Sequence, residues 1–145
     1  MKQNVMVRIR SEQQYEEEAP DISDFLTLGT IEQTEKGIAI SYEESELTGL
    51  QGTTTTFQLE RDRIVLKREG TLRSEMIFAI NQEHRSLYDM GMGAMMITVR
   101  TMALVQAMSM DGGMIQVEYD LLVEDCYVGQ VSYRILVTPT GREES

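Results

Sequence analysis

Apolar residues alternate with polar ones along most of this 145-residue chain. Val5, Val7 and Ile9 alternate with polar neighbours near the start, and the same pattern returns over residues 115–123. A period of two places every second side chain on one face of a β-strand, whereas the period of an α-helix is 3.6. The pattern therefore predicts an all-β chain whose strands each have one dry face.

The segments that join these strands are short. The sequence TEKG ends a turn at Gly37, and MDGG (residues 110–113) is a strong hairpin signal. Parallel pairing needs connections of about a dozen residues or more, so the pairing is expected to be antiparallel. The expected strands cover residues 5–10, 25–33 with a bulge at Gly29, 38–42, 53–59, 64–66, 72–78, a short segment ending near 88, 94–107, 115–123 and 131–137.

An open sheet of this many strands would leave two unpaired edges and one bare apolar face. Closing the sheet pairs the edges and buries that face. We therefore predict one domain over residues 1–145, an antiparallel up-and-down β-barrel of about 8–10 strands with a polar tail at 139–145. A two-layer sandwich is the alternative.

Four consecutive threonines, Thr53 to Thr56, raise the question of what their hydroxyls bind. Threonine is β-branched and suits a strand, and Phe57 and Leu59 continue the parity of Thr53 and Thr55. The run therefore starts a strand with two inward hydroxyls. Buried hydroxyls need partners, which are either neighbouring protein groups, water or a ligand.

Three segments resemble a known family. They are YEESELTGLQGTTTT (residues 42–56), GTLRSEMIF (70–78) and HRSLY (84–88). In these segments the chain resembles the YwiB-like family of bacterial proteins of uncharacterised function. The resemblance implies a lipocalin-like, or calycin-like, β-barrel and brings no activity or catalytic residue with it. Where relatives carry a proline and an aromatic residue before a glycine, this chain reads MGMG at 90–93.

The net charge, the cysteine content and the N-terminal sequence argue against several classes of partner and location. A net charge of −11 repels a phosphate backbone, so no nucleic-acid partner is expected. One cysteine, Cys126, permits no intrachain disulfide. The start MKQNVMVRIR does not read as a signal peptide, and no apolar run is long enough for a membrane helix. We expect a cytoplasmic protein without cofactor or metal.

No recognisable catalytic motif is present. The single His84 and the single Cys126 have no spacing that relates them, and no glycine-rich phosphate loop occurs. Glu44 and Glu46 could share a strand face, which is weak support for a cation site or an acid. We expect no enzymatic activity. An enzyme using Glu44 with Tyr42 and Arg73 would rest on analogy with other barrels alone.

Binding of a small, partly apolar ligand inside the barrel is the leading functional prediction, because barrels of this size can enclose one small molecule. The alternative is that the tyrosines fill the interior and the protein is a structural or interaction module. The inward parities predict these ligand-binding residues: Tyr42, Thr53, Thr55, Ser74, Tyr88, Tyr119 and Tyr133.

Methionine is concentrated in one segment. Eight of the 11 methionines lie between Met90 and Met114. Methionine is flexible and suits surfaces that meet varied apolar partners. The segment from Ala94 to Ala107 is apolar on both faces over part of its length, so its outer face could need a cover. Ordinary core packing, a lumen for an apolar ligand and a homodimer seam remain alternatives.

Overall fold

The structure is a computed structural model that describes residues 2–15, 19–46, 48–89 and 91–140. All regular elements in these residues are strands. They are β1 (Lys2–Gln14), β2 (Asp21–Thr34), β3 (Gly37–Glu43), β4 (Thr54–Leu59), β5 (Ile64–Glu69), β6 (Ser74–Phe78), β7 (Glu83–Asp89), β8 (Ala94–Ser109), β9 (Gly112–Val123) and β10 (Cys126–Pro139). In the predicted tail, residues 141–145 lie outside the described residues.

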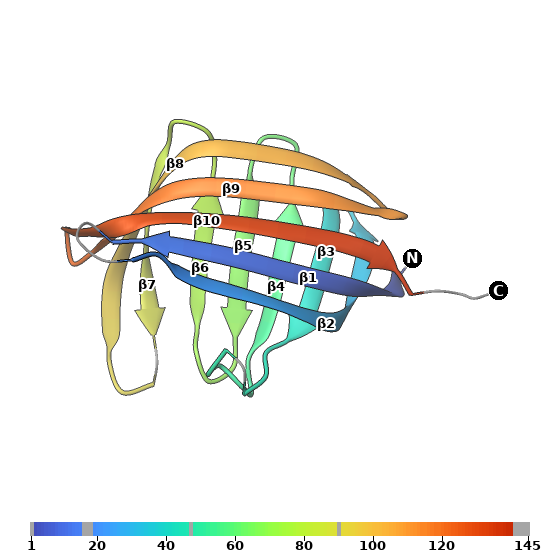
Figure 1. Cartoon of the computed structure of the whole chain (residues 1–145), viewed down its shortest axis with the longest axis horizontal. Helices are drawn as coiled ribbons and strands as arrows, with labels where there is room; N and C mark the ends of the chain where they lie inside the picture. The colour runs from blue at the N-terminus through green and yellow to red at the C-terminus, as the bar shows by residue number, and fades with distance from the viewer. Residues whose placement is uncertain (1, 16–18, 47, 90, 141–145) are drawn as a thin grey trace.

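The strands form one antiparallel meander that wraps into a nearly closed barrel, which confirms the predicted fold class. The sheet order is β6-β5-β4-β3-β2-β1-β10-β9-β8-β7. The first and last strands meet, since β1 pairs with β10 from Val5–Pro139 to Gln14–Gln130. Figure 1 shows the long strands β8, β9, β10, β1 and β2 crossing in front of the shorter strands β3 to β7. The barrel is therefore flattened, with its two walls running crosswise.

The remaining gap lies between β6 and β7. Only one bridge joins these strands among the described residues, where Arg73 and Asp89 exchange backbone N–H···O bonds of 2.8 and 2.9 Å. Farther along the gap, the backbone N–H of Ile77 donates to Nδ1 of His84 at 3.3 Å. A side chain thus replaces one bond of the missing strand ladder, and that bond requires an unprotonated Nδ1.

Protonation of His84 should weaken this edge of the barrel. Burial lowers the pKa of His84 below the ordinary 6.5, against a smaller opposing effect of Glu75. The unfolded chain then binds the proton more readily, so stability is full above pH 6.5 and falls as the pH drops toward the lowered pKa. Urea unfolding at pH 5–8 should show this loss in the wild type and not in His84→Gln, which keeps an acceptor. Equal pH dependence in both proteins would contradict the role of His84.

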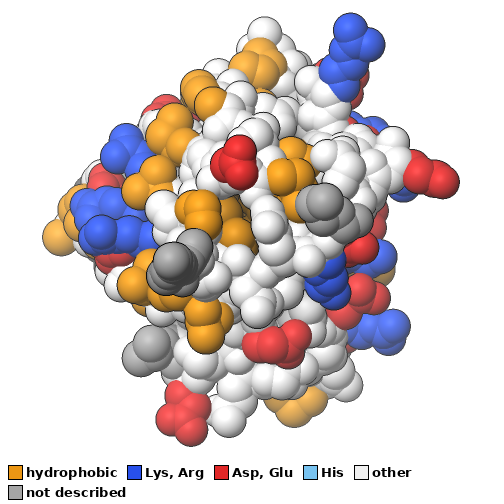
Figure 2. Space-filling model, turned by 90° about the vertical axis from the view of Figure 1, so that its right-hand side faces the viewer, with side chains coloured by type: hydrophobic (Ala, Val, Ile, Leu, Met, Phe, Trp, Pro, Cys, Tyr) orange, Lys and Arg blue, Asp and Glu red, His pale blue; other side chains and the backbone are white. Residues whose placement is uncertain are grey.

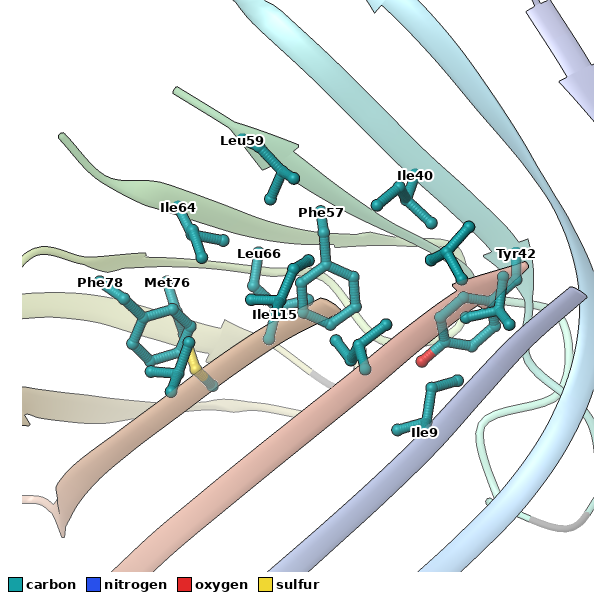
Figure 3. Close-up of a cluster of buried hydrophobic side chains, with 14 of the residues drawn as sticks. Ile9, Ile40, Tyr42, Phe57, Leu59, Ile64, Leu66, Met76, Phe78 and Ile115 are labelled. Carbon is teal, nitrogen blue, oxygen red and sulfur yellow. The ribbon is translucent and has the colours of Figure 1, made fainter. Parts of the chain in front are cut away.

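The core fills most of the barrel with the alternating apolar residues predicted from the sequence. Phe57, Leu66 and Phe78 are at most 2% exposed. Figure 3 shows these side chains converging on Ile115 and Met76 in the barrel interior. Apolar burial of this extent is the main stabilising contribution to such a fold.

Several local predictions need correction. Residues 11–14 belong to β1 and not to a loop, because they pair with β2 and β10. Gly29 makes no bulge, since its pairing is regular on both sides. A Cβ on Gly29 would lie 2.5 Å from the carbonyl oxygen of Ser41, so close packing explains this glycine. Register shifts occur instead at 101–103 in β8 and 127–129 in β10.

These two shifts lie in the strands that flank β9 and insert no residue into β9 itself. Ile115, Val117 and Tyr119 are buried as predicted, and Leu121 packs against the core although it is only partly buried. Leu122, which has the opposite parity, is also buried at this end of β9.

The outer surface is unevenly apolar. In Figure 2, hydrophobic side chains are denser on the left, the side of the long strands, than on the right. Leu26 and Leu28 on β2 are 60% and 65% exposed, and Leu136 on β10 is 39% exposed. Within the described part of the chain, no helix has the length and apolarity needed to cross a membrane.

Candidate functional site

A pocket of about 320 Å³ lies at the end of the barrel where β3 and β5 finish. Its walls come from β1, β2, β3, β5, β7 and β10 and from the β3–β4 connection (residues 44–53). Its lining residues are Ile9, Ser11, Ser23, Phe25, Tyr42, Glu44, Thr48, Leu50, Arg68, Tyr88 and Tyr133. Eight of these eleven side chains carry a polar group, and Ile9, Phe25 and Leu50 supply the apolar part of the wall.

The β3–β4 connection folds back over this end of the barrel. The Glu44 N–H donates to the Thr53 carbonyl at 2.9 Å, and the Thr53 N–H donates to the Leu50 carbonyl at 3.1 Å. Gly70 lies against it with a φ of +143°, and a Cβ there would be 2.1 Å from the Gly52 carbonyl oxygen. Only glycine fits at that position. Two local turns and one close contact thus hold Thr48 and Leu50 over the pocket.

One row of cross-strand neighbours supplies the polar wall. The register places Tyr42 opposite Thr55, Thr55 opposite Arg68, and Arg68 opposite Ser74. All four side chains are buried on the inner face. Because directly opposed residues on one face of a sheet lie side by side, this row forms a continuous polar band inside the barrel.

Glu44 is buried and bonded to threonines. Its Oε1 accepts a hydrogen bond from Thr48 Oγ1 at 2.8 Å, and its Oε2 accepts one from Thr55 Oγ1. The carboxyl is 7% exposed and lines the pocket. Thr55 thereby links β4 to the residue that begins the β3–β4 connection, which fixes one acidic group at the pocket wall.

Arg68 is the buried cation of the site. Its side chain is 9% exposed, and Nη2 donates to the Tyr133 hydroxyl at 3.2 Å. Its Nε is buried and has no hydrogen-bond partner among the described residues. Burial opposes the charged form of Arg68, while the hydrogen bond to Tyr133 and the nearby Glu44 carboxyl favour it. The guanidinium therefore stays charged.

The tyrosines of the interior remain neutral at physiological pH. Burial raises the pKa of Tyr42, and Glu44 raises it further. Burial also raises the pKa of Tyr88 and, more strongly, that of Tyr119. Figure 3 shows the Tyr42 ring turned into the barrel. Neutral phenols can each donate and accept a hydrogen bond inside the pocket.

An aromatic series connects the core to the pocket. The ring centroids of Phe78 and Tyr119 are 4.8 Å apart, and Tyr119 stacks on Tyr133 at 6.4 Å. Phe57 meets Tyr133 edge to face at 6.5 Å. Tyr119 is buried, whereas Tyr133 reaches the pocket, so the stacked rings extend from the packed core to the pocket wall.

The structure brings three of the seven sequence-predicted residues to the pocket: Tyr42, Tyr88 and Tyr133. Tyr119 packs behind Tyr133. The Thr53 hydroxyl accepts from the Leu72 N–H at 3.3 Å, and the Thr55 hydroxyl donates to Glu44. Ser74 is buried beside Arg68, and its hydroxyl has no partner among the described residues.

All four hydroxyls of the threonine run have protein partners. Besides these two inward bonds, Thr54 donates to Glu43 at 2.7 Å and the Thr56 hydroxyl lies 2.9 Å from that of Ser41. The threonine hydroxyls therefore form their hydrogen bonds with the neighbouring strand and with the residues on either side of β4. Protein groups account for these hydroxyls, which was one of the alternatives left open by the sequence.

Arg68 is the main residue that sequence reasoning missed. The segment Arg68–Gly70 was expected to be a turn, but β5 continues to Glu69. The signal was present, because Arg68 continues the inward parity of Ile64 and Leu66. The expected strand ended at residue 66, and the parity was not followed to Arg68, a type of residue that is rarely buried.

The other residues that the sequence suggested for catalysis or metal binding do not lie together. Glu46 is exposed while Glu44 is buried, so the two carboxyls share no site. Arg73 is exposed on the far side of the β5–β6 turn, so it cannot join Tyr42 and Glu44. Cys126 is exposed and free. Among the described residues no group of three His, Cys, Asp or Glu side chains could hold a metal ion.

The methionines of β8 and its neighbours divide between interior and surface. Met108 and Met110 pack against the core, and Met102 on β8 is 41% exposed. Met92, before β8, is 97% exposed, and Met90 lies outside the described residues. Core packing thus accounts for part of the set, and the homodimer seam remains a prediction.

Three comparisons place the chain among known proteins. The model of a family described as "Domain of unknown function (DUF1934)" matches residues 7–135. The crystal structure of the YwiB protein from Bacillus subtilis is similar in fold, with a TM-score of 0.86 at 16% sequence identity, over 97% of this chain and 94% of that chain. A comparison with curated proteins finds no match.

Proposed function

Since the chain belongs to the DUF1934 family of unknown function, we propose from its own geometry that it binds a small, partly apolar molecule in the barrel without transforming it. The observation that carries the proposal is the open pocket of about 320 Å³ beside a packed core. Its volume lies at the small end of the range of about 300–1,000 Å³ typical of ligand sites.

The lining suits a molecule with one polar end. Ile9, Phe25 and Leu50 supply apolar contacts, while Arg68 and the tyrosines supply hydrogen-bond donors. Among the described residues, no group of three His, Cys, Asp or Glu side chains at the pocket could hold a metal ion. Binding in the reducing cytoplasm would also suit an exposed free thiol at Cys126.

Native mass spectrometry of the protein purified from its own host tests this proposal. We expect a bound small molecule that leaves on denaturation. Ser11→Phe should abolish its retention, because Ser11 lines the pocket. Ser132→Phe is the matched control, since Ser132 is the neighbour of Tyr133 on β10 and lies on the opposite strand face.

The outcomes separate the alternatives. Retention that Ser11→Phe does not alter, or no retained molecule in any sample, would contradict binding in the pocket. The recovered molecule should keep its mass after incubation with fresh protein, and a changed mass would show catalysis instead. The same spectra count the subunits and so test the homodimer prediction.

A further inference from the structure

Arg68 is a buried charge without a counter-ion. The ion pairs among the described residues involve Arg8, Arg10, Arg63, Arg85 and Arg100, and none includes Arg68. Its guanidinium lines the pocket, yet its Nε has no partner and its Nη2 has only a neutral phenol. Burying a charge that forms no ion pair is unfavourable, so an anion bound at this guanidinium would be stabilised.

Glu44 does not fill that role. No Glu44 oxygen lies within 4.0 Å of an Arg68 nitrogen, and both carboxyl oxygens already accept from threonine hydroxyls. The nearby tyrosines stay neutral because burial raises their pKa values. The pocket wall thus offers several donors and one carboxylate, Glu44, which forms no ion pair with Arg68.

Ser74, the neighbour of Arg68 in this row, does not line the pocket itself, but its hydrogen bonding is also incomplete. It lies directly opposite Arg68 on β6, and its hydroxyl is also buried without a partner. Buried polar atoms in folded proteins are nearly always hydrogen-bonded. Two unsatisfied neighbours in one row mark the place where the protein alone leaves its hydrogen bonding incomplete.

We propose that the pocket takes the carboxylate of a small monocarboxylic acid, with Arg68 as its principal contact. This inference rests on the proposed function and names its ligand class. A planar carboxylate matches the two parallel N–H groups of a guanidinium. The apolar remainder of the acid lies against Ile9, Phe25 and Leu50.

A single negative charge fits the site better than two. One guanidinium neutralises one carboxylate, and Glu44 nearby would repel the second charge of a phosphate. The chain's net charge of −11 repels any anion at long range, but salt screens that repulsion beyond about 8 Å. The contact with buried Arg68 is screened far less.

Calorimetric titration with matched probes tests the inference. The probes are 3-phenylpropionate and octanoate, each beside its uncharged amide. In the wild type we expect each acid to bind at least about thirtyfold more tightly than its amide, because losing a buried charge contact costs that much. Arg68→Met should remove the preference for the acid, so that acid and amide bind with similar affinity, whereas Arg68→Lys should keep part of the preference.

Failure here is distinguishable from failure of the proposed function. Suppose that acid and amide bind the wild type with equal affinity and that Ser11→Phe abolishes the binding of both. That result would overturn the proposed carboxylate ligand and would leave the proposal of a binding pocket standing. A preference for the acid that survives in Arg68→Met would also overturn the carboxylate ligand. So would phenyl phosphate binding more tightly than the acids, or the absence of binding by all probes at millimolar concentration. A carboxylic acid among the molecules recovered from the host would support it.

Discussion

Replacing Phe57 with alanine lowers the free energy of unfolding by about 3–5 kcal/mol. The ring is 2% exposed on β4, opposite Ile40 on one side and Leu66 on the other. The strand backbone holds these neighbours apart, so they cannot close the cavity that the ring leaves. Denaturant unfolding should show the loss, and the melting temperature should fall by about 10–20 °C.

Phe57→Leu is the matched variant. It keeps much of the apolar volume and should lose clearly less stability than alanine. Because Phe57 also meets the ring of Tyr133, the alanine variant should weaken probe binding as well. A loss below about 1 kcal/mol for Phe57→Ala would show that the ring is not part of a packed core.

Replacing Arg68 with methionine raises the free energy of unfolding of the ligand-free protein by about 1–3 kcal/mol. Methionine has a similar unbranched stem and removes a charge that has no counter-ion within ion-pair distance. The Tyr133 hydroxyl loses its partner at 3.2 Å, which offsets the gain only in part because that group can reach the pocket. The melting temperature should rise by about 3–10 °C.

Arg68→Lys separates charge from shape in this experiment. Lysine keeps a buried positive charge, so it should bring no gain in stability. Adding a carboxylate probe should stabilise the wild type and leave Arg68→Met unchanged, since only a bound ligand shifts the folding equilibrium. Destabilisation of the ligand-free protein by Arg68→Met would mean that Arg68 is already neutralised without ligand. A stabilising mutation that removes binding is the expected compromise at a functional site.

Much of the fold could be predicted because it depends on local patterns. The parity of Val5, Val7 and Ile9 identifies an inner face without reference to any other strand, and all three are buried. The DGG of residues 111–113 predicts its hairpin in the same way. A Cβ on Gly113 would lie 2.0 Å from the Ala107 carbonyl oxygen, so this glycine is required by the hairpin.

The site was only partly predictable. Tyr42, Tyr88 and Tyr133 have the inward parity that the sequence indicated, and they line the pocket. Tyr119 has the same parity but packs behind Tyr133, away from the pocket. The sequence could not show this difference, because a period of two gives the face of a strand and not the distance from the barrel end. Arg68 was missed because the expected strand ended at residue 66, whereas β5 continues to Glu69. Its neighbours in space, Tyr133 and Ser74, are set by the pairing of strands.

By itself, the sequence determined that this chain is an antiparallel meander with one apolar face, because side-chain parity and turn chemistry act over a few residues. The sequence also predicted a closed sheet, because closure pairs the two edges, and β1 does pair with β10. Tertiary structure alone decided that a gap falls between β6 and β7 and that a charged pocket stays open at one end. Those features depend on register between segments far apart in the chain. A shift of one or two residues in that register would move Arg68 away from Tyr133 and leave every local pattern intact.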